Sequence, residues 1–368
     1  MANLFDYLLW RGDLTLDQSP FNDVDSLALS AVSYVFFEGI VPEAWNTPLS
    51  FGRAAELYFQ RPKEKQLARA EEDIRLFREM AACRRYKRMG LCGYVSRLDK
   101  EAEKQFSALT LLLEDGTAYI AFRGTDRSIV GWKEDFNMSF RDTVPAQVEA
   151  AAYLEAAAKA LGGVRLRVGG HSKGGNLAVY AAAMAPKAVQ DILLSVDNHD
   201  GPGFHETMLA RAGYQSILPR VQTFLPQSSV IGMLLEHEEA YTVVKSTETG
   251  VMQHDPYSWE VQGPDFIRME GLTEQSRFLD KTLKRWLNEV GENQRELFVD
   301  AVYAAVTEGQ KNGEELSPRM VIGAIQALKD EDAATKTVIG NSVKQLLQAA
   351  AETAAEYAAA LPKKGRRE

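Results

Sequence analysis

The feature that most restricts the fold is a glycine-rich corner between a predicted strand and a predicted helix. Residues 164–183 read V-R-L-R-V-G-G-H-S-K-G-G-N-L-A-V-Y-A-A-A. The first five of these residues predict a short strand, and the apolar run from residue 174 predicts a helix. Between them, Gly170 and Gly174 flank Ser172 in the pattern G-x-S-x-G. This pattern is typical of a strand that turns sharply into a helix and holds its central serine in a strained, exposed conformation.

Ser172 has the surroundings that a serine nucleophile needs. The helix behind it points backbone N–H groups, which carry partial positive charge, toward any group attached to the hydroxyl. The N–H of Lys173, the next residue, is therefore a predicted donor to an oxygen that becomes negative during acyl transfer. The alternative interpretation is a glycine-rich turn whose serine has no chemical role.

Strand and helix patterns alternate around this corner. Residues 107–114 and 117–124 predict a β-hairpin, because Asp115 and Gly116 form a typical turn pair between two apolar runs. Further patterns predict a helix at 145–161 and strands at 191–198, 221–225 and 240–246. Such alternation is typical of a mostly parallel sheet covered by helices on both faces, so we predict an α/β fold.

The segments on either side of this alternation are predicted to be helical. Before it, we expect helices at 3–13, 23–38 (capped by Asp23 or Asp25) and 63–82, then an edge strand at 89–98. After it, we expect helices at 273–290, 293–308, 317–329 and 333–361. The predicted domains are an N-terminal helical segment that packs on the sheet (1–88), the sheet domain (89–271) and a C-terminal helical region (272–368). The last region is a candidate surface for formation of a homo-oligomer.

Composition excludes several classes of function. A net charge of −9 argues against a general nucleic-acid-binding protein, because phosphate groups attract the opposite charge. The two cysteines, Cys83 and Cys92, do not make a disulfide framework or a metal site. The N-terminal residues lack the pattern of a signal peptide, and no apolar run is long enough to span a membrane. We therefore expect a cytoplasmic protein without a cofactor, a metal or a transmembrane segment.

A serine nucleophile requires a base, usually a histidine that is oriented by a carboxylate. The chain has five histidines. His254 lies in the loop after the last predicted strand, which is where the base is found when the order is serine, acid, histidine. The other histidines are His171, His199, His205 and His237. His171 is expected to point away from Ser172, and the remaining three do not fit the order, so His254 is the predicted base.

The acid is predicted less directly. Asp200, in D-G-P-G-F after the strand at 191–198, is placed well, and Asp197 is the nearby alternative. The turn after the strand at 221–225 holds no carboxylate, and the remaining candidates are Glu236, Glu238 and Glu239. We favour Asp200, although an aspartate in a glycine-proline turn is also a common turn cap.

Two motifs resemble the class 3 (fungal-type) lipases of the α/β-hydrolase superfamily. The first is A-F-R-G-T-D-R-S-I-V-G-W-K-E-D-F (121–136), with F-R-G-T before a W-x-x-D helix at Trp132 and Asp135. The second is G-G-H-S-K-G-G-N-L-A (169–178), where lysine replaces the more usual leucine. The resemblance covers residues 90–260. Within the superfamily, the chain looks like a bacterial branch. The resemblance implies an α/β-hydrolase fold and Thr125 as the second oxyanion donor, but the family's acid position reads P-Q-S-S here, so the resemblance does not assign the acid.

These observations predict a serine hydrolase that cleaves small-molecule or lipid esters through an acyl-serine intermediate. Residues 228–236 are expected to form a short helix, of which 228–235 either lines an acyl pocket, acts as a lid, or is core. Two other classes of function stay open. One is a hydrolase fold without catalysis that serves as a binding or scaffold protein. The other is a serine peptidase or acyltransferase, which uses the same nucleophile chemistry.

Overall fold

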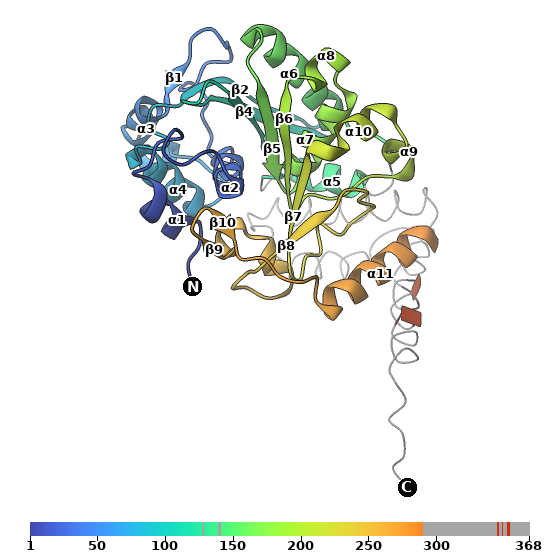
Figure 1. Ribbon diagram of the computed structural model, residues 1–368. Coiled ribbons are helices and arrows are strands. Elements are labelled where there is room, and N and C mark those ends of the chain that lie inside the picture. Colours follow the sequence, from blue (N-terminus) through green and yellow to red (C-terminus); the bar gives the residue numbers. More distant parts are fainter. Residues whose placement is uncertain (127–128, 139–140, 290–343, 346–347, 349–351, 354–368) are drawn as a thin grey trace. The chain divides into compact units, whose positions relative to one another are not determined.

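The computed structural model of the chain describes residues 1–126, 129–138, 141–289, 344–345, 348 and 352–353 (Figure 1). It divides into two compact units. The first consists of Met1–Asp135 and Asp142–Leu272. The second consists of Phe136–Arg141 and Thr273–Glu368, and its one long described helix is α11 (Glu274–Glu289). The helices predicted at 293–308 and 317–329 lie outside the described residues, as does most of 333–361.

The first unit is built around a central sheet, which has eight strands among the residues that the structure describes. They are β1 (Leu49–Ser50), β2 (Gly90–Asp99), β3 (Lys104–Leu112), β4 (Ala118–Phe122), β5 (Leu166–His171), β6 (Leu193–His199), β7 (Val221–Pro226) and β8 (Tyr241–Val244). Their order in space equals their order in sequence; β1 to β4 pair antiparallel and β4 to β8 pair parallel. The predicted α/β class, a mostly parallel sheet covered by helices, is confirmed.

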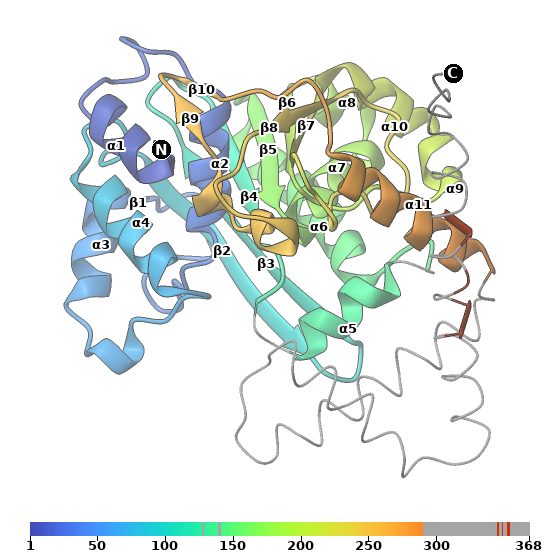
Figure 2. The same ribbon diagram turned by 90° about the horizontal axis from the view of Figure 1, so that it is seen from below.

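The helices between the parallel strands cover one face of the sheet (Figures 1 and 2). Because the strand order never reverses, right-handed crossovers place all of these connections on the same side. The connecting helices are α5 (Ile129–Asn137), α6 (Pro145–Leu161), α7 (Lys173–Met184), α8 (Lys187–Gln190), α9 (Glu206–Leu209) and α10 (Ala212–Ile217). The sheet's other face therefore needs a cover from elsewhere in the chain.

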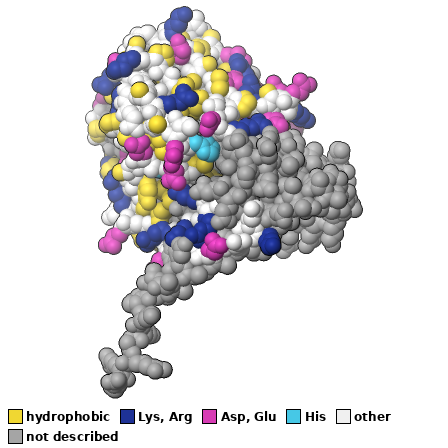
Figure 3. Space-filling view, turned by 90° about the vertical axis from the view of Figure 1, so that its right-hand side faces the viewer, with side chains coloured by type: hydrophobic (Ala, Val, Ile, Leu, Met, Phe, Trp, Pro, Cys, Tyr) yellow, Lys and Arg dark blue, Asp and Glu magenta, His cyan; other side chains and the backbone are white. Residues whose placement is uncertain are grey.

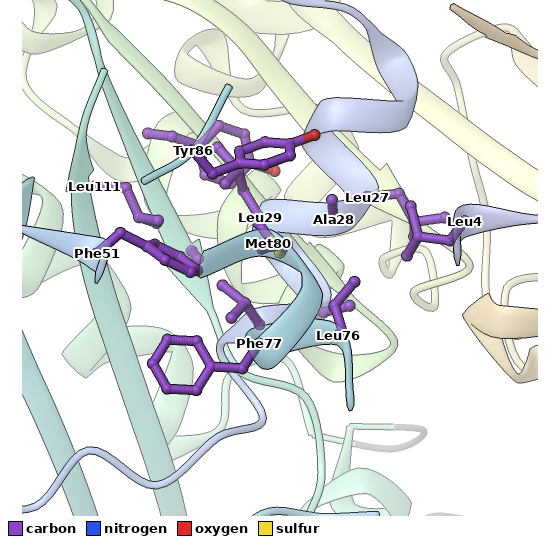
Figure 4. Close-up of a cluster of buried hydrophobic side chains, with 14 of the residues drawn as sticks. Leu4, Leu27, Ala28, Leu29, Phe51, Leu76, Phe77, Met80, Tyr86 and Leu111 are labelled. Carbon is purple, nitrogen blue, oxygen red and sulfur yellow. The ribbon is translucent and has the colours of Figure 1, made fainter. Parts of the chain in front are cut away.

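That cover comes from the N-terminal segment, which lies on the opposite side in both views (Figures 1 and 2). Its helices are α1 (Leu4–Arg11), α2 (Asp23–Val32), α3 (Phe51–Phe59) and α4 (Glu71–Ala82). Alternation along β4 shows the division: Tyr119 and Ala121 join the core under these helices, while Ile120 and Phe122 join the core under α6 and α7. Figure 4 shows part of the first core, which includes Phe77 and Met80 of α4 and Leu111 of β3.

A buried ion pair ties the N-terminal segment together. Arg85 is fully buried, and its Nε lies 2.7 Å from Asp25 Oδ1. The same carboxylate accepts hydrogen bonds from the hydroxyls of Tyr7 (2.9 Å) and Tyr86 (2.7 Å). Since breaking a buried pair leaves an uncompensated charge, this cluster fixes α2 against the chain that follows α4.

Two helix predictions are wrong for a shared reason. The helix expected at 23–38 ends at Val32, and the helix expected at 63–82 begins only at Glu71, after a short 3-10 turn η1 (Lys63–Lys65). The backbones between these limits pair with each other: Phe36 N donates to Leu67 O (2.9 Å), and Arg69 N donates to Tyr34 O (3.2 Å). The cap of α2 is Asn22, with Asp25 at the third helical position.

The helix expected at 228–236 is also absent from the described residues. Glu236 N donates to Phe204 O (3.1 Å) and Gly203 N donates to Leu234 O (2.9 Å), so the segment pairs with the turn after β6. Leu235 has a φ of 64°, which no helix allows. The strand predicted at 89–98 forms as β2. It is not the edge strand that we expected, because the two-residue β1 pairs on its outer side.

Among the described residues, no helix has both the length and the apolarity to cross a membrane. On the face in Figure 3, charged side chains of both signs are interspersed with hydrophobic ones.

A small hairpin of β9 (Val261–Gln262) and β10 (Asp265–Phe266) follows the 3-10 turns η3 (Gly250–His254) and η4 (Pro256–Ser258).

Candidate active site

Ser172 lies at the junction of β5 and α7 in a strained backbone conformation. Its φ is 59° and its ψ is −134°, a region that L-residues rarely adopt. Its N–H donates to His199 O (2.9 Å) at the end of β6, which fixes the corner to the neighbouring strand. The side chain stays partly exposed at the carboxyl edge of the sheet.

Two glycines allow this corner to pack against the loop after β4. A Cβ on Gly174 would overlap the carbonyl oxygen of Phe122, the last residue of β4. A Cβ on Gly124 would lie 2.5 Å from His171 O and 3.2 Å from Ser172 Cβ. The F-R-G-T loop therefore runs directly beside the serine, which only residues without a side chain permit.

Asp200 follows β6 and is completely buried. Its own N–H donates to Phe224 O on β7 (2.9 Å), and its φ is 53°. Oδ1 accepts a hydrogen bond from Ser229 Oγ (2.5 Å), and Oδ2 lies 2.6 Å from His254 Nδ1. Both carboxylate oxygens thus have a donor, which is the condition for holding a buried charge.

His254 closes η3 in the loop after β8, with its side chain 25% exposed. Because the Asp200 carboxylate accepts, His254 Nδ1 carries the proton of this hydrogen bond, and Nε2 of the neutral ring is left as a base. The structure thus brings Asp200 and His254 into contact beside the Ser172 corner. Within the described part of the chain, no hydrogen bond joins Ser172 Oγ to His254 Nε2.

His171 points away from Ser172, as the sequence predicts, and contacts the base instead. Its Nε2 lies 2.7 Å from the backbone oxygen of His254, and its Nδ1 lies 2.9 Å from Tyr34 Oη. A carbonyl only accepts, so Nε2 donates and Nδ1 accepts from the Tyr34 hydroxyl. Burial, with the nearby His254 and Arg69, lowers the pKa of His171 well below its usual range. The neutral ring therefore links the N-terminal segment to the main chain of His254.

The N-terminal segment also holds the rest of the His254 loop. Tyr257 donates its hydroxyl to Asp73 Oδ1 (2.7 Å), and its backbone oxygen accepts from Asn3 Nδ2 (3.1 Å). Inside the loop, Trp259 Nε1 donates to Gln253 O (2.9 Å). The N-cap residue of α1 and a residue of α4 thus hold the loop that carries the predicted base.

The alternative acids and bases have other partners. Asp197 accepts from Ser195 Oγ (3.2 Å), and burial together with Asp23 raises its pKa to about 7. Glu239 Oε1 lies 2.9 Å from His237 Nδ1. His199 Nε2 lies 2.8 Å from Ser26 Oγ. Among the described residues, no side-chain hydrogen bond joins these groups to the side chain of His254 or Ser172.

The predicted oxyanion donors belong to the two segments that meet at the serine corner. Lys173 is the first residue of α7, and Thr125 follows Gly124 in the loop after β4. The Thr125 hydroxyl donates to Asp135 Oδ2 in α5. Trp132, the other motif residue, belongs to α5, but its side chain lies outside the described ones.

Three contributors to this site were not predicted from the sequence. Tyr34 and Ser229 come from distant parts of the chain, whereas Lys173 is next to Ser172 and extends its side chain to Gln105 and Glu134. Only the S-S pair after β7, in the position where lipases carry the acid, signalled that polar groups gather there. Over the described residues, no cluster of three His, Cys, Asp or Glu side chains is placed to hold a metal ion.

Comparison with solved structures returns lipases at low similarity. The Rhizomucor miehei lipase in its propeptide complex is 15% identical, with 52% of this chain and 65% of that chain covered and a TM-score of 0.34. Lipase II from Rhizopus niveus is 17% identical, with 46% and 72% covered and a TM-score of 0.32. M37 lipase is 15% identical, with 66% and 84% covered and a TM-score of 0.37.

Sequence comparison gives the family. No curated protein matches the chain. The profile of the family described as Mbeg1-like matches residues 80–304, which is more than half of the chain and includes Ser172, Asp200 and His254. The chain belongs to the Mbeg1-like family.

Proposed function

We propose that the chain is a serine hydrolase that cleaves carboxylic esters through an acyl-serine intermediate. The observation that carries the proposal is the 2.6 Å contact between His254 Nδ1 and Asp200 Oδ2 beside Ser172, which is held at a φ of 59°. A histidine whose Nδ1 is bonded to a buried carboxylate has the tautomer and orientation that a general base requires.

In the proposed reaction, Ser172 Oγ attacks the ester carbonyl carbon while its proton passes to His254 Nε2. The carbon–oxygen bond to the alcohol then breaks, and the departing oxygen takes that proton from Nε2. Water next gives a proton to Nε2 and attacks the acyl carbon, and the bond to Ser172 Oγ breaks as the serine recovers its proton. Asp200 stabilises the imidazolium in both halves without becoming protonated.

The N–H groups of Lys173 and Thr125 are the proposed donors to the oxyanion of each tetrahedral intermediate. The proximity of the Gly124 backbone to Ser172 supports this assignment, because it brings the F-R-G-T loop beside the reacting oxygen. The class 3 lipase resemblance of both motifs supports an ester as substrate. A cytoplasmic location and self-association through the C-terminal helices remain part of the proposal.

The test is labelling of purified protein by a fluorophosphonate probe, with Ser172→Ala, His254→Ala and Ser195→Ala beside the wild type. Such a probe reacts with a serine whose base and oxyanion donors are assembled. We expect labelling of the wild type and of Ser195→Ala, whose serine lies on β6 outside the site, and none in the other two variants.

Absence of wild-type labelling in folded protein, with and without detergent micelles, would reject the hydrolase and favour a scaffold protein. A positive result leads to a panel of esters, thioesters and peptide amides. Preferential turnover of amides, or transfer to an acceptor other than water, would replace esterase by peptidase or acyltransferase.

A further inference from the structure

The side chain of Lys173 is buried beneath the corner that carries Ser172. It is 1% exposed, and its Nζ lies 2.6 Å from Gln105 Oε1, 3.0 Å from Gln105 O and 3.0 Å from Glu134 Oε2. A buried ammonium is tolerated only with such partners. The side chain therefore reaches from α7 to β3 and to α5.

The two carboxylates of α5 near Lys173 have different partners. Glu134 is fully buried and accepts from the N–H groups of Gln105 (3.0 Å) and Ala146 (2.9 Å), so it joins three elements of the fold. Asp135 is 36% exposed, and its Oδ2 accepts from the Thr125 hydroxyl. Its Oδ1 is buried, has no hydrogen-bond partner among the described residues, and lies 4.0 Å from Lys173 Nζ.

We propose that Lys173 is a positioning residue for the oxyanion donors: its ammonium holds Asp135, and Asp135 holds Thr125 beside Ser172. Both donors then depend on one residue, because Lys173 supplies the first N–H from its backbone and orients the second through its side chain. This inference rests on the proposed function. It gives a role to the lysine that stands where similar lipases usually carry leucine.

Electrostatics at Asp135 support this geometry. Burial raises the pKa of Asp135 to about 6, while the Lys173 ammonium and the Thr125 hydroxyl lower it. The titratable and charged groups around it are Lys173, Glu134, His254 and Tyr34. Without the ammonium, Asp135 would bind a proton at higher pH, and its hydrogen bond from Thr125 would lose the assistance of a charge.

The test is a double-mutant cycle on the rate of fluorophosphonate labelling, with Lys173→Met, Asp135→Asn and the double variant. Lys173→Met keeps the backbone N–H. We expect it to slow labelling about tenfold, the equivalent of one hydrogen bond, and to have little further effect once Asp135 is asparagine. In Lys173→Met, the acid midpoint of the labelling rate should move to higher pH, and the same change should not move it in the Asp135→Asn background.

Additive losses, or equal midpoint shifts in both backgrounds, would show that Lys173 acts through Glu134 and the fold alone and would overturn the inference. Lys173→Gln keeps a donor for Glu134 and carries the same comparison where Lys173→Met does not fold. Wild-type labelling with an unchanged rate in the lysine variants overturns only this inference. No labelling of the wild type overturns the proposed function as well.

Discussion

His171 Nε2 lies 2.7 Å from the backbone oxygen of His254, so one buried histidine holds the main chain of the other. The centroids of the two imidazole rings are 4.6 Å apart. Tyr34 Oη approaches the other nitrogen of His171 at 2.9 Å. The N-terminal segment thus does more than cover a face of the sheet, because the neutral ring of His171 connects it to the main chain of the proposed base.

This link predicts a loss of reactivity when His171 is replaced. His171→Phe keeps a ring of similar size but loses both hydrogen bonds, so we expect fluorophosphonate labelling of Ser172 to slow about tenfold, the equivalent of one buried hydrogen bond. Tyr34→Phe removes only the distal donor and should have a smaller effect. Tyr58→Phe is the matched control, because Tyr58 donates to Leu67 O (2.9 Å) away from the site. Equal rates in all four proteins would contradict the link.

The proposed acid gives a second prediction. Asp200→Asn keeps a residue that tolerates a φ of 53°, but it removes the charge that orients and stabilises His254. We expect the labelling rate to fall on the order of 10³- to 10⁴-fold. Ser229→Ala, which removes one donor to the same carboxylate, should cost far less. Asp197→Asn is the control carboxylate and should label like the wild type; a large loss there instead would transfer the role of acid to Asp197.

Local patterns predicted much of the fold. The hairpin around Asp115 and Gly116 and the helix at 145–161 form as expected, since turn chemistry and a terminal glycine act over a few residues. The strand before Ser172 begins two residues later than predicted and runs on to His171. Both helix-length errors in the N-terminal segment came from pairing between residues 34–36 and 67–69, which no local pattern reveals.

The candidate site likewise contains residues that local sequence predicts and residues that only the tertiary structure brings together. Ser172 was recognisable because the G-x-S-x-G corner is a local constraint. Asp200 was favoured by its place after a strand, but its contacts with Ser229 and His254 join residues from three separate loops. The roles of Tyr34 and of the Lys173 side chain depend on which segments cover the sheet, and that is a property of the tertiary structure.

A third prediction concerns stability and the buried Asp197. Burial, with the Asp23 carboxylate, raises its pKa to about 7 in the folded state, against about 3.9 when unfolded. Between these values the folded chain binds the extra proton, so this group makes stability fall as pH rises. Asp197→Asn should therefore raise the free energy of unfolding more at pH 8 than at pH 5, as measured by denaturant titration. Asp17→Asn, on the surface, is the control; an Asp197→Asn effect independent of pH would contradict the assignment.

The opposite sign applies to the buried His199. Burial lowers its pKa to about 3, against about 6.5 when unfolded. The unfolded chain binds the extra proton between these values, so stability is present above pH 6.5 and is lost as pH falls toward 3. His199→Phe keeps the stacking on Phe224, whose ring centre is 5.3 Å away, and should flatten the pH dependence of the unfolding free energy between pH 6.5 and 4. Ser26→Ala removes the 2.8 Å partner but leaves the titrating ring, so it should lower stability at every pH and keep the wild-type slope. Parallel curves for His199→Phe and the wild type would show that acid unfolding begins at another group.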